Sequence, residues 1–205
     1  MRSNKTRAQF LTSACCILAL LLADSLSAWA QFGRTFSAAK AGEDSGEECT
    51  IGAACGRATK DGRPMIWKTR DSSPRNNAIS YNSSARYRFI AVIDGGSASS
   101  SWMSINEKGF AILNSVASDL KAASSGPGNG SFMTLAVGTC ASIAEFEQLL
   151  DSTNVTQRTT EANFAVMDST GGAAIFETGG TSYWKFDAAS PAAGYVLRTN
   201  FALNG

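Results

Sequence analysis

The sequence contains no histidine. Catalysis by a Ser-His-Asp triad or a Cys-His pair needs an imidazole as its base, and histidine-ligated zinc sites need it as a ligand. These three kinds of site are therefore excluded. A nucleophile in this chain needs another base, and an N-terminal residue that carries both a thiol and a free α-amine supplies one.

A large net charge is lacking too. The 18 Lys and Arg residues nearly balance the 17 Asp and Glu residues, which leaves a formal net charge of +1, and 44% of the residues are hydrophobic. Nucleic-acid binding depends on positive charge against the phosphates, so the composition gives no argument for a nucleic-acid partner. It predicts an ordinary globular domain.

The first 30 residues predict an export signal. Three basic residues precede an apolar stretch at positions 10–23, and Ala28-Trp29-Ala30 gives the small-x-small pattern of a cleavage site. A membrane anchor is the alternative, but the stretch is shorter than the roughly 20 residues that span a bilayer. We therefore expect a secreted or periplasmic protein with no membrane span after residues 1–30 are removed.

The next segment, residues 31–48, is predicted to be a propeptide or linker. It is rich in Ala, Gly and Ser and ends in an acidic run from Glu43 to Glu48. This composition is typical of an exposed peptide with little order. Residues 49–205 then form the expected single domain.

Five cysteines become three when Cys15 and Cys16 leave with the signal. An odd number in an exported protein leaves at least one thiol unpaired or paired between chains, and Cys49 is the candidate for the free one. Cys55 and Cys140 either form a disulfide or remain two buried thiols. The sequence leaves both alternatives open.

Most of the domain reads as antiparallel strands joined by turns. The expected strands are 50–58, 64–68, 86–94, 102–105, 110–114, 163–167, 173–176, 183–186 and 195–198. The turn signal Lys60-Asp61-Gly62 makes a hairpin of the first two. Ser142 and Glu145 form a capping box for a helix over about 143–150, with further helix at 132–137. The pattern predicts an α+β fold.

Four short motifs follow one another from the start of this domain. They are Cys49-Thr50, Thr59 to Pro64, Trp67 to Asp71, and Asn106 to Ser115. In this order they resemble the N-terminal nucleophile (Ntn) hydrolases. Among their branches the motifs look most like the autoproteolytic isopenicillin-N/acyl-CoA acyltransferase-like family (peptidase C45-like), and they are distantly similar to the choloylglycine hydrolases. The similarity extends from Cys49 to about Asn200.

The resemblance implies a four-layer αββα sandwich of antiparallel sheets and a defined chemistry. Cleavage before Cys49 frees an α-amine, whose ordinary pKa near 8 lets it accept the thiol proton directly or through a water. The thiolate attacks a linear amide (N-acyl) bond of a small molecule, and water or a second amine resolves the thioester. The same thiol, attacking the carbonyl of Glu48, releases the propeptide. The family needs no metal or organic cofactor.

The resemblance also assigns charged residues to the site. Asp71 matches the aspartate that fixes the amine. Lys68 stands where the cousin hydrolases have an arginine, three residues before that aspartate, and Arg70 is adjacent to it. Because alternate residues of a strand face opposite sides, Lys68 and Arg70 share a face, with Asp71 opposite unless the strand ends first. Either cation could lower the pKa of the thiol, and a surface ion pair is the alternative for each.

Two asparagines complete the set. Asn114 matches the asparagine whose amide donates to the developing oxyanion, and Asn200 matches a second one beside the nucleophile. Turn caps are the alternative for both. Trp67 and Trp102 are weaker candidates for a substrate pocket, with buried core as the alternative.

Two other expectations bear on function. Relatives of this kind continue beyond position 205, so the resemblance predicts a C-terminally truncated domain. A non-catalytic secreted binding module or pseudoenzyme of the same fold is the alternative to an enzyme, and a disulfide- or metal-based structural module is a third. The substrate, the choice between hydrolysis and acyl transfer, and the oligomeric state stay open.

Overall fold

A computed structural model describes residues 48–72 and 76–205. The expected export signal lies outside these residues, and so does the expected propeptide except for Glu48. No helix in the described part is long and apolar enough to cross a bilayer.

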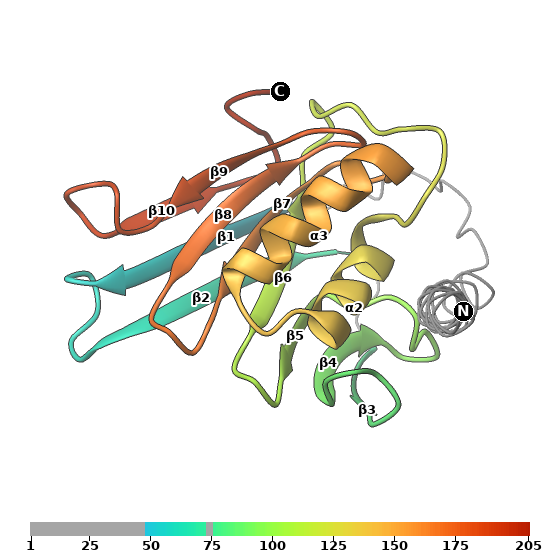
Figure 1. Ribbon diagram of the computed structural model, residues 1–205, viewed down its shortest axis with the longest axis horizontal. Coiled ribbons are helices and arrows are strands. Elements are labelled where there is room, and N and C mark those ends of the chain that lie inside the picture. The colour runs from blue at the N-terminus through green and yellow to red at the C-terminus, as the bar shows by residue number, and fades with distance from the viewer. Residues whose placement is uncertain (1–47, 73–75) are drawn as a thin grey trace, which may run out of the picture. The chain divides into compact units, whose positions relative to one another are not determined.

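The domain contains two antiparallel sheets (Figure 1). The small sheet has the order β10-β1-β2 and consists of β1 (Glu48–Gly56), β2 (Gly62–Asp71) and β10 (Tyr195–Arg198). The large sheet runs in sequence order from β3 to β9. Its strands are β3 (Asn77–Asn82), β4 (Phe89–Asp94), β5 (Met103–Asn106), β6 (Ala111–Val116), β7 (Ala162–Met167), β8 (Ala173–Thr178) and β9 (Tyr183–Asp187).

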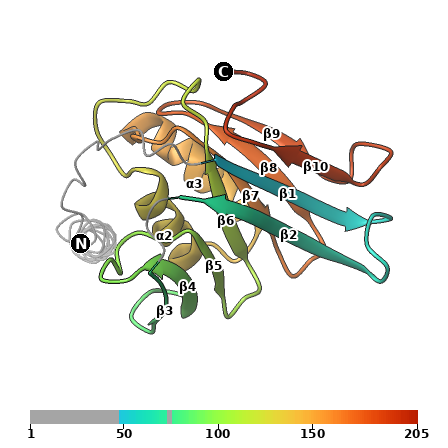
Figure 2. The same ribbon diagram turned by 180° about the vertical axis from the view of Figure 1, so that it is seen from behind.

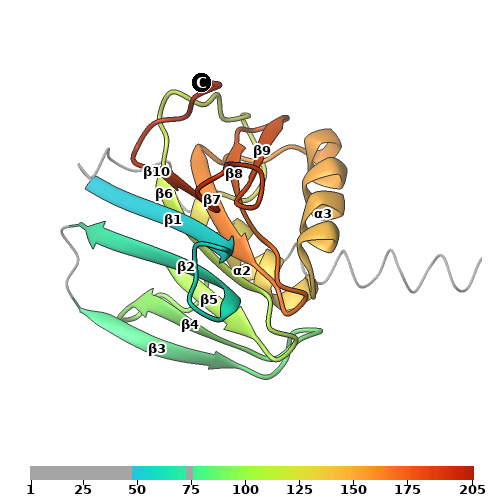
Figure 3. The same ribbon diagram turned by 90° about the vertical axis from the view of Figure 1, so that its left-hand side faces the viewer.

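Two helices, α2 (Asn129–Thr139) and α3 (Ile143–Thr156), cover one face of the large sheet. Figure 2, seen from behind, shows the small sheet against the other face, and Figure 3 shows the layers from the side. The expected cap of α3 is confirmed, because Glu145 N donates to Ser142 Oγ at 3.2 Å. The side chain of Glu145 reaches back to accept from Ala141 N at 2.7 Å, which satisfies a second free donor at this helix end.

Two cores hold the layers together. The core between the helices and the large sheet contains five fully buried phenylalanines: Phe110, Phe132, Phe146, Phe164 and Phe176. The core between the two sheets is built from smaller residues such as Ile51, Ala53, Leu113, Ala165 and Ile175. Burying one phenylalanine side chain contributes about 1.5 to 3 kcal/mol to stability. The first core therefore stabilises the large sheet, against which the small sheet packs.

The expected α+β sandwich of antiparallel sheets is confirmed, with one difference in the layers. Within residues 48–72 and 76–205 the helices lie on one side only, so the order is helix, sheet, sheet, and a second outer helical layer is not among these elements. The predicted strand at 195–198 matches β10 residue for residue. The strand β3 was not predicted.

The structure distinguishes the two alternatives for Cys55 and Cys140, a disulfide or two buried thiols. Cys55 belongs to the core between the sheets, whereas Cys140 belongs to the core under the helices. The large sheet separates the two cores, and Cys49, Cys55 and Cys140 are all free thiols. A Cys55–Cys140 disulfide is therefore wrong, and the alternative of buried free thiols is confirmed.

Candidate active site

The β1–β2 hairpin brings Cys49 and two cations to one face. In the register of the two strands, Cys49 is opposite Arg70 and Ile51 is opposite Lys68. Directly opposite residues of an antiparallel pair share a face, and Ile51 belongs to the core between the sheets. Cys49, Lys68 and Arg70 are therefore directed toward the large sheet, and Cys49 is buried, with 3% of its surface exposed.

Asp71 and Trp67 lie on the opposite face of the hairpin. The strand β2 continues to Asp71, which is exposed and lies opposite Glu48 in the register of the two strands. The structure therefore does not bring the carboxylate of Asp71 to the thiol of Cys49. Trp67 pairs with Gly52, where a Cβ atom would clash with the indole ring. The indole therefore covers the outer surface of β1, away from Cys49.

Asn200 reaches the main-chain nitrogen of Cys49. Its Oδ1 accepts a hydrogen bond from Cys49 N at 2.5 Å, and its Nδ2 donates to the carbonyl of Val116 at 3.0 Å. Asn200 follows β10 by two residues, so this one amide ties the start of β1 to the end of β6. A cut before Cys49 would turn the nitrogen that Asn200 binds into the α-amine.

Asn114 is joined to the small sheet through Lys68. Asn114 lies in β6, just beyond the last residue that pairs with β5, and only 1% of its surface is exposed. Its Oδ1 accepts a hydrogen bond from Lys68 Nζ at 3.2 Å. It is opposite Phe164, whose ring belongs to the core under the helices, so it does not share the face of Leu113. Within the described part of the chain its Nδ2 makes no hydrogen bond, which leaves this donor available to a bound oxygen.

Trp102, immediately before β5, lies against both cations. The guanidinium carbon of Arg70 is 4.0 Å from the centroid of its ring and Lys68 Nζ is 5.4 Å from it, both within cation–π range. Arg70 also pairs with Asp94 at 3.1 Å and donates to Asn77 at 2.7 Å. These contacts fix Arg70 against the large sheet, whereas Lys68 is directed to Asn114.

The other two thiols are poor nucleophiles. Burial raises the pKa of Cys140 to about 12. Burial and the nearby charge of Asp187 also raise the pKa of Cys55 above its ordinary value. Since the thiolate is the reactive form, both cysteines stay protonated and inert near neutral pH.

Sequence reasoning missed three buried polar residues next to the site: Ser115, Asn163 and Glu177. Ser115 Oγ donates to the carbonyl of Thr199 at 2.7 Å, and Asn163 Nδ2 reaches the same carbonyl at 3.2 Å. Glu177, fully buried, accepts from Arg198 Nε at 2.6 Å. A polar residue inside an otherwise apolar strand could have indicated them, because a buried polar side chain needs a hydrogen-bond partner.

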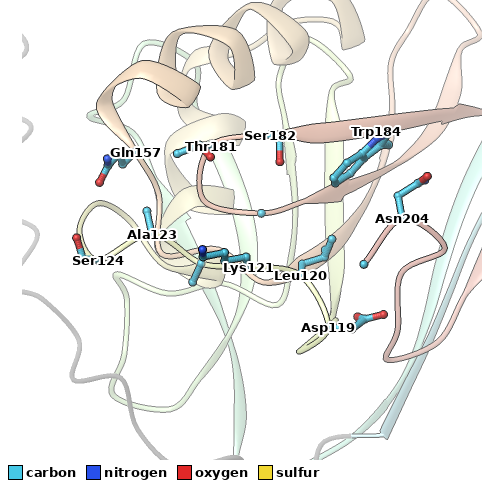
Figure 4. Close-up of a pocket in the computed structure, with 13 residues that line it drawn as sticks. Asp119, Leu120, Lys121, Ala123, Ser124, Gln157, Thr181, Ser182, Trp184 and Asn204 are labelled. Atoms are coloured by element: carbon cyan, nitrogen blue, oxygen red, sulfur yellow. The ribbon is translucent and has the colours of Figure 1, made fainter.

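Two cavities of the domain differ in their relation to the expected site residues. The larger, about 650 Å³, is lined by residues such as Asp119, Lys121 and Trp184 and includes none of the expected site residues (Figure 4). The smaller, about 290 Å³, is apolar. Its lining includes Met103 and Leu113, which are next in the chain to Trp102 and Asn114. Among the described residues, no group of His, Cys, Asp and Glu side chains is placed to hold a metal ion.

No family model matches the chain, and no curated protein is similar to it in sequence. Solved structures similar to it include two variants of the conjugated bile acid hydrolase of Clostridium perfringens, at 16% identity with a TM-score of 0.49 and at 11% identity with a TM-score of 0.42. The penicillin V acylase of Agrobacterium tumefaciens is 12% identical, with a TM-score of 0.39. The matches cover 71%, 73% and 70% of this chain and 52%, 44% and 42% of those chains, respectively. The chain therefore spans about half the length of these structures.

Proposed function

We propose that this protein is an exported cysteine hydrolase or acyltransferase of the Ntn type, which cleaves or transfers the acyl group of a linear amide through a thioester on Cys49. The observation that carries this proposal is the 2.5 Å hydrogen bond between Cys49 N and Asn200 Oδ1. The pairing of β1 with β10 ends at Ile51, so the side chain of Asn200 supplies the acceptor that no main-chain carbonyl of β10 gives to the Cys49 nitrogen. A nitrogen that becomes a catalytic base needs an acceptor that orients it.

Maturation uses the same thiol as turnover. The Cys49 sulfur attacks the carbonyl carbon of Glu48, the bond between that carbon and the Cys49 nitrogen breaks as the nitrogen takes up a proton, and water hydrolyses the resulting thioester. The products are a released segment that ends at Glu48 and a chain that begins with Cys49. Loss of Glu48 also removes a carboxylate from the position opposite Asp71, and the new ammonium forms at Cys49, the next residue of the strand. We therefore assign Asp71 the role of holding the amine by charge rather than that of contacting the thiol.

Turnover proceeds in two stages. The Cys49 amine takes the thiol proton, the sulfur attacks the substrate carbonyl, and the ammonium returns the proton to the leaving amine. Water or a second amine then attacks the thioester and regenerates the thiol. Asn114 Nδ2 donates to the carbonyl oxygen as it becomes negative, a contact whose loss typically costs about 100- to 1,000-fold in rate.

The cations and the apolar cavity complete the proposed site. Lys68 holds Asn114 by its Oδ1, which leaves the Nδ2 donors for a bound oxygen, and the charge of Lys68 favours both the thiolate and the oxyanion. Arg70, fixed by Asp94 and Trp102, adds a positive charge at the position opposite Cys49. The apolar cavity beside Met103 and Leu113 suits the acyl part of a small N-acyl substrate.

The test is acyl transfer to the thiol itself. The mature protein is incubated with a panel of N-acyl amides, stopped in acid, and weighed by mass spectrometry. We expect an added acyl mass on the peptide that begins with Cys49, together with released amine, and neither in Cys49→Ala. Tight binding of a substrate without amine release by wild type would support the non-catalytic binding module instead.

A further inference from the structure

Asn200 lies in a segment without regular secondary structure, residues 199–204, whose position is set by side chains of other elements. Asp119 accepts from Ala202 N with both carboxylate oxygens, at 3.0 and 2.9 Å. Glu177 accepts from Leu203 N at 2.8 Å and from Asn204 N at 3.0 Å. These contacts hold the end of the segment but do not reach the peptide units beside Asn200.

A single buried amide holds those peptide units. Asn163, in β7 and fully buried, donates through Nδ2 to the carbonyl of Thr199 at 3.2 Å and to the carbonyl of Phe201 at 3.0 Å. Ser115 Oγ lies 3.3 Å from the same Nδ2 and donates to Thr199 O at 2.7 Å. The residues immediately before and after Asn200 are thus both fixed to the large sheet by Asn163.

We propose that Asn163 is a positioning residue, which holds Asn200 Oδ1 at the nitrogen of Cys49. The catalytic consequence rests on the proposed function, but the placement itself does not. Because Asn200 is also tied through Nδ2 to Val116 O, the two anchors together fix both the main chain and the amide plane of Asn200. A shift of about 1 Å in such a supporting contact can cost about 100-fold in rate.

Asn106 offers a matched control. It is also a buried asparagine in the large sheet, and its Nδ2 donates to two main-chain carbonyls, of Val137 and Cys140, each at 2.7 Å. These contacts are to the last turn of α2 and to the residue that follows the helix, not to residues 199–204. Asn163→Ala leaves the carbonyl of Phe201 without this donor, and Asn106→Ala does the same to the carbonyls of Val137 and Cys140. The Oδ1 of Asn106 also accepts from Lys108 N and Phe110 N, so Asn106→Ala breaks at least as many buried hydrogen bonds and is a stringent control for lost stability. Only the loss of Asn163 should affect residue 49.

The first test needs no catalysis. In the full chain with Cys49→Ala, which cannot cut itself, hydrogen exchange is measured at the amide of residue 49 and compared with that of Ile51 in the same strand. We expect Asn163→Ala to speed exchange at residue 49 by about tenfold relative to Ile51, because the hydrogen bond to Asn200 is loosened. Asn106→Ala should leave this ratio unchanged. An unchanged ratio in Asn163→Ala overturns the proposal.

Ser115→Ala serves if Asn163→Ala does not fold, because it removes one of the donors to Thr199 O and leaves the packing almost intact. It should raise the same exchange ratio by a smaller factor, and an unchanged ratio counts against the proposal in the same way.

The second test measures activity per folded molecule. Asn163→Ala should lower kcat by about 100-fold with little change in KM, whereas Asn106→Ala stays within about twofold of wild type. The acid limb of kcat/KM should move to lower pH in Asn163→Ala, because a charged amine that loses an acceptor has a lower pKa. A normal kcat and pH profile would contradict the catalytic role. If wild type itself releases no amine, the proposed function fails, while the exchange ratio still decides the placement.

Discussion

The side-chain oxygen of Asn200 lies 2.5 Å from the main-chain nitrogen of Cys49, although 151 positions separate the two residues in the chain. The contact joins the first strand to the segment that follows the last one. It places a neutral acceptor, which does not titrate, at the atom that the proposed chemistry uses as its base.

Asn200→Ala should lower kcat/KM by about 10- to 100-fold, because a hydrogen bond to a charged or charging nitrogen is worth about 1.5 to 3 kcal/mol. Steady-state kinetics on an N-acyl substrate checks this. Asn204→Ala is the control, since Asn204 belongs to the same segment and donates to Glu177 rather than to Cys49. Equal losses in both variants would mean that the segment matters only for stability.

Asn114→Ala should lower kcat by about 100- to 1,000-fold while the protein stays folded, because the oxyanion loses its amide donor. Circular dichroism and urea unfolding establish the folded fraction, and kcat is expressed per folded molecule. A rate near that of wild type would remove Asn114 from the site.

Of the three cysteines in the described domain, only Cys49 should react quickly with iodoacetamide in the folded mature protein. The pKa of Cys140, raised to about 12 by burial, leaves almost no thiolate at pH 8, and the pKa of Cys55 is raised for the same main reason. Peptide mapping after brief labelling locates the adduct. Labelling of Cys140 at the rate of Cys49 would contradict the proposed activation of the Cys49 thiol by its own amine.

Glu177→Gln should destabilise the protein by about 3 to 5 kcal/mol at pH 7, because it leaves the buried guanidinium of Arg198 without its carboxylate. Burial alone raises the pKa of Glu177, but hydrogen bonds from Leu203, Arg198 and Asn204 outweigh it and hold the pKa below its ordinary value. The carboxylate therefore contributes stability above the pKa of the unfolded chain, and this contribution is lost as pH falls through the folded pKa.

Urea unfolding at pH 7 and below pH 4 measures both effects. Wild type should lose more unfolding free energy on acidification than Glu177→Gln does. Glu147→Gln is the control, because Glu147 pairs with Lys185 at the surface and such pairs contribute about 1 kcal/mol or less. A similar small loss in both variants would show that the buried pair is not a structural support.

The local patterns of the sequence predicted most of the fold. The hairpin around Lys60-Asp61-Gly62, the cap at Ser142 and the shared face of Lys68 and Arg70 all follow from turn chemistry, capping and strand alternation, and the structure confirms each. The strand β3 was missed, and its large apolar residues are mostly exposed rather than buried in a core: Ile79 is 72% exposed and Tyr81 62%. Alternation identifies a strand only where its apolar side is buried.

The candidate site was less accessible to sequence reasoning. Cys49 and Asn200 were paired only through a family resemblance, because nothing local to either residue indicates a contact across the whole domain. Asn163 carried no motif, and its role depends on two carbonyls that reach it only in the folded chain. The resemblance gave Asp71 the role of fixing the amine, while strand alternation put it on the face opposite Lys68 and Arg70 unless the strand ended first. The strand continues through Asp71, and its carboxylate lies on that opposite face.

The most direct test of the account is the N-terminus of the exported protein, determined by N-terminal sequencing and intact mass for wild type, Cys49→Ala and Cys55→Ala from the same host. We predict that wild type and Cys55→Ala begin at Cys49 and that Cys49→Ala retains the preceding segment. A wild-type chain that begins at Gln31, or a Cys49→Ala chain cut at the same bond as wild type, would contradict it.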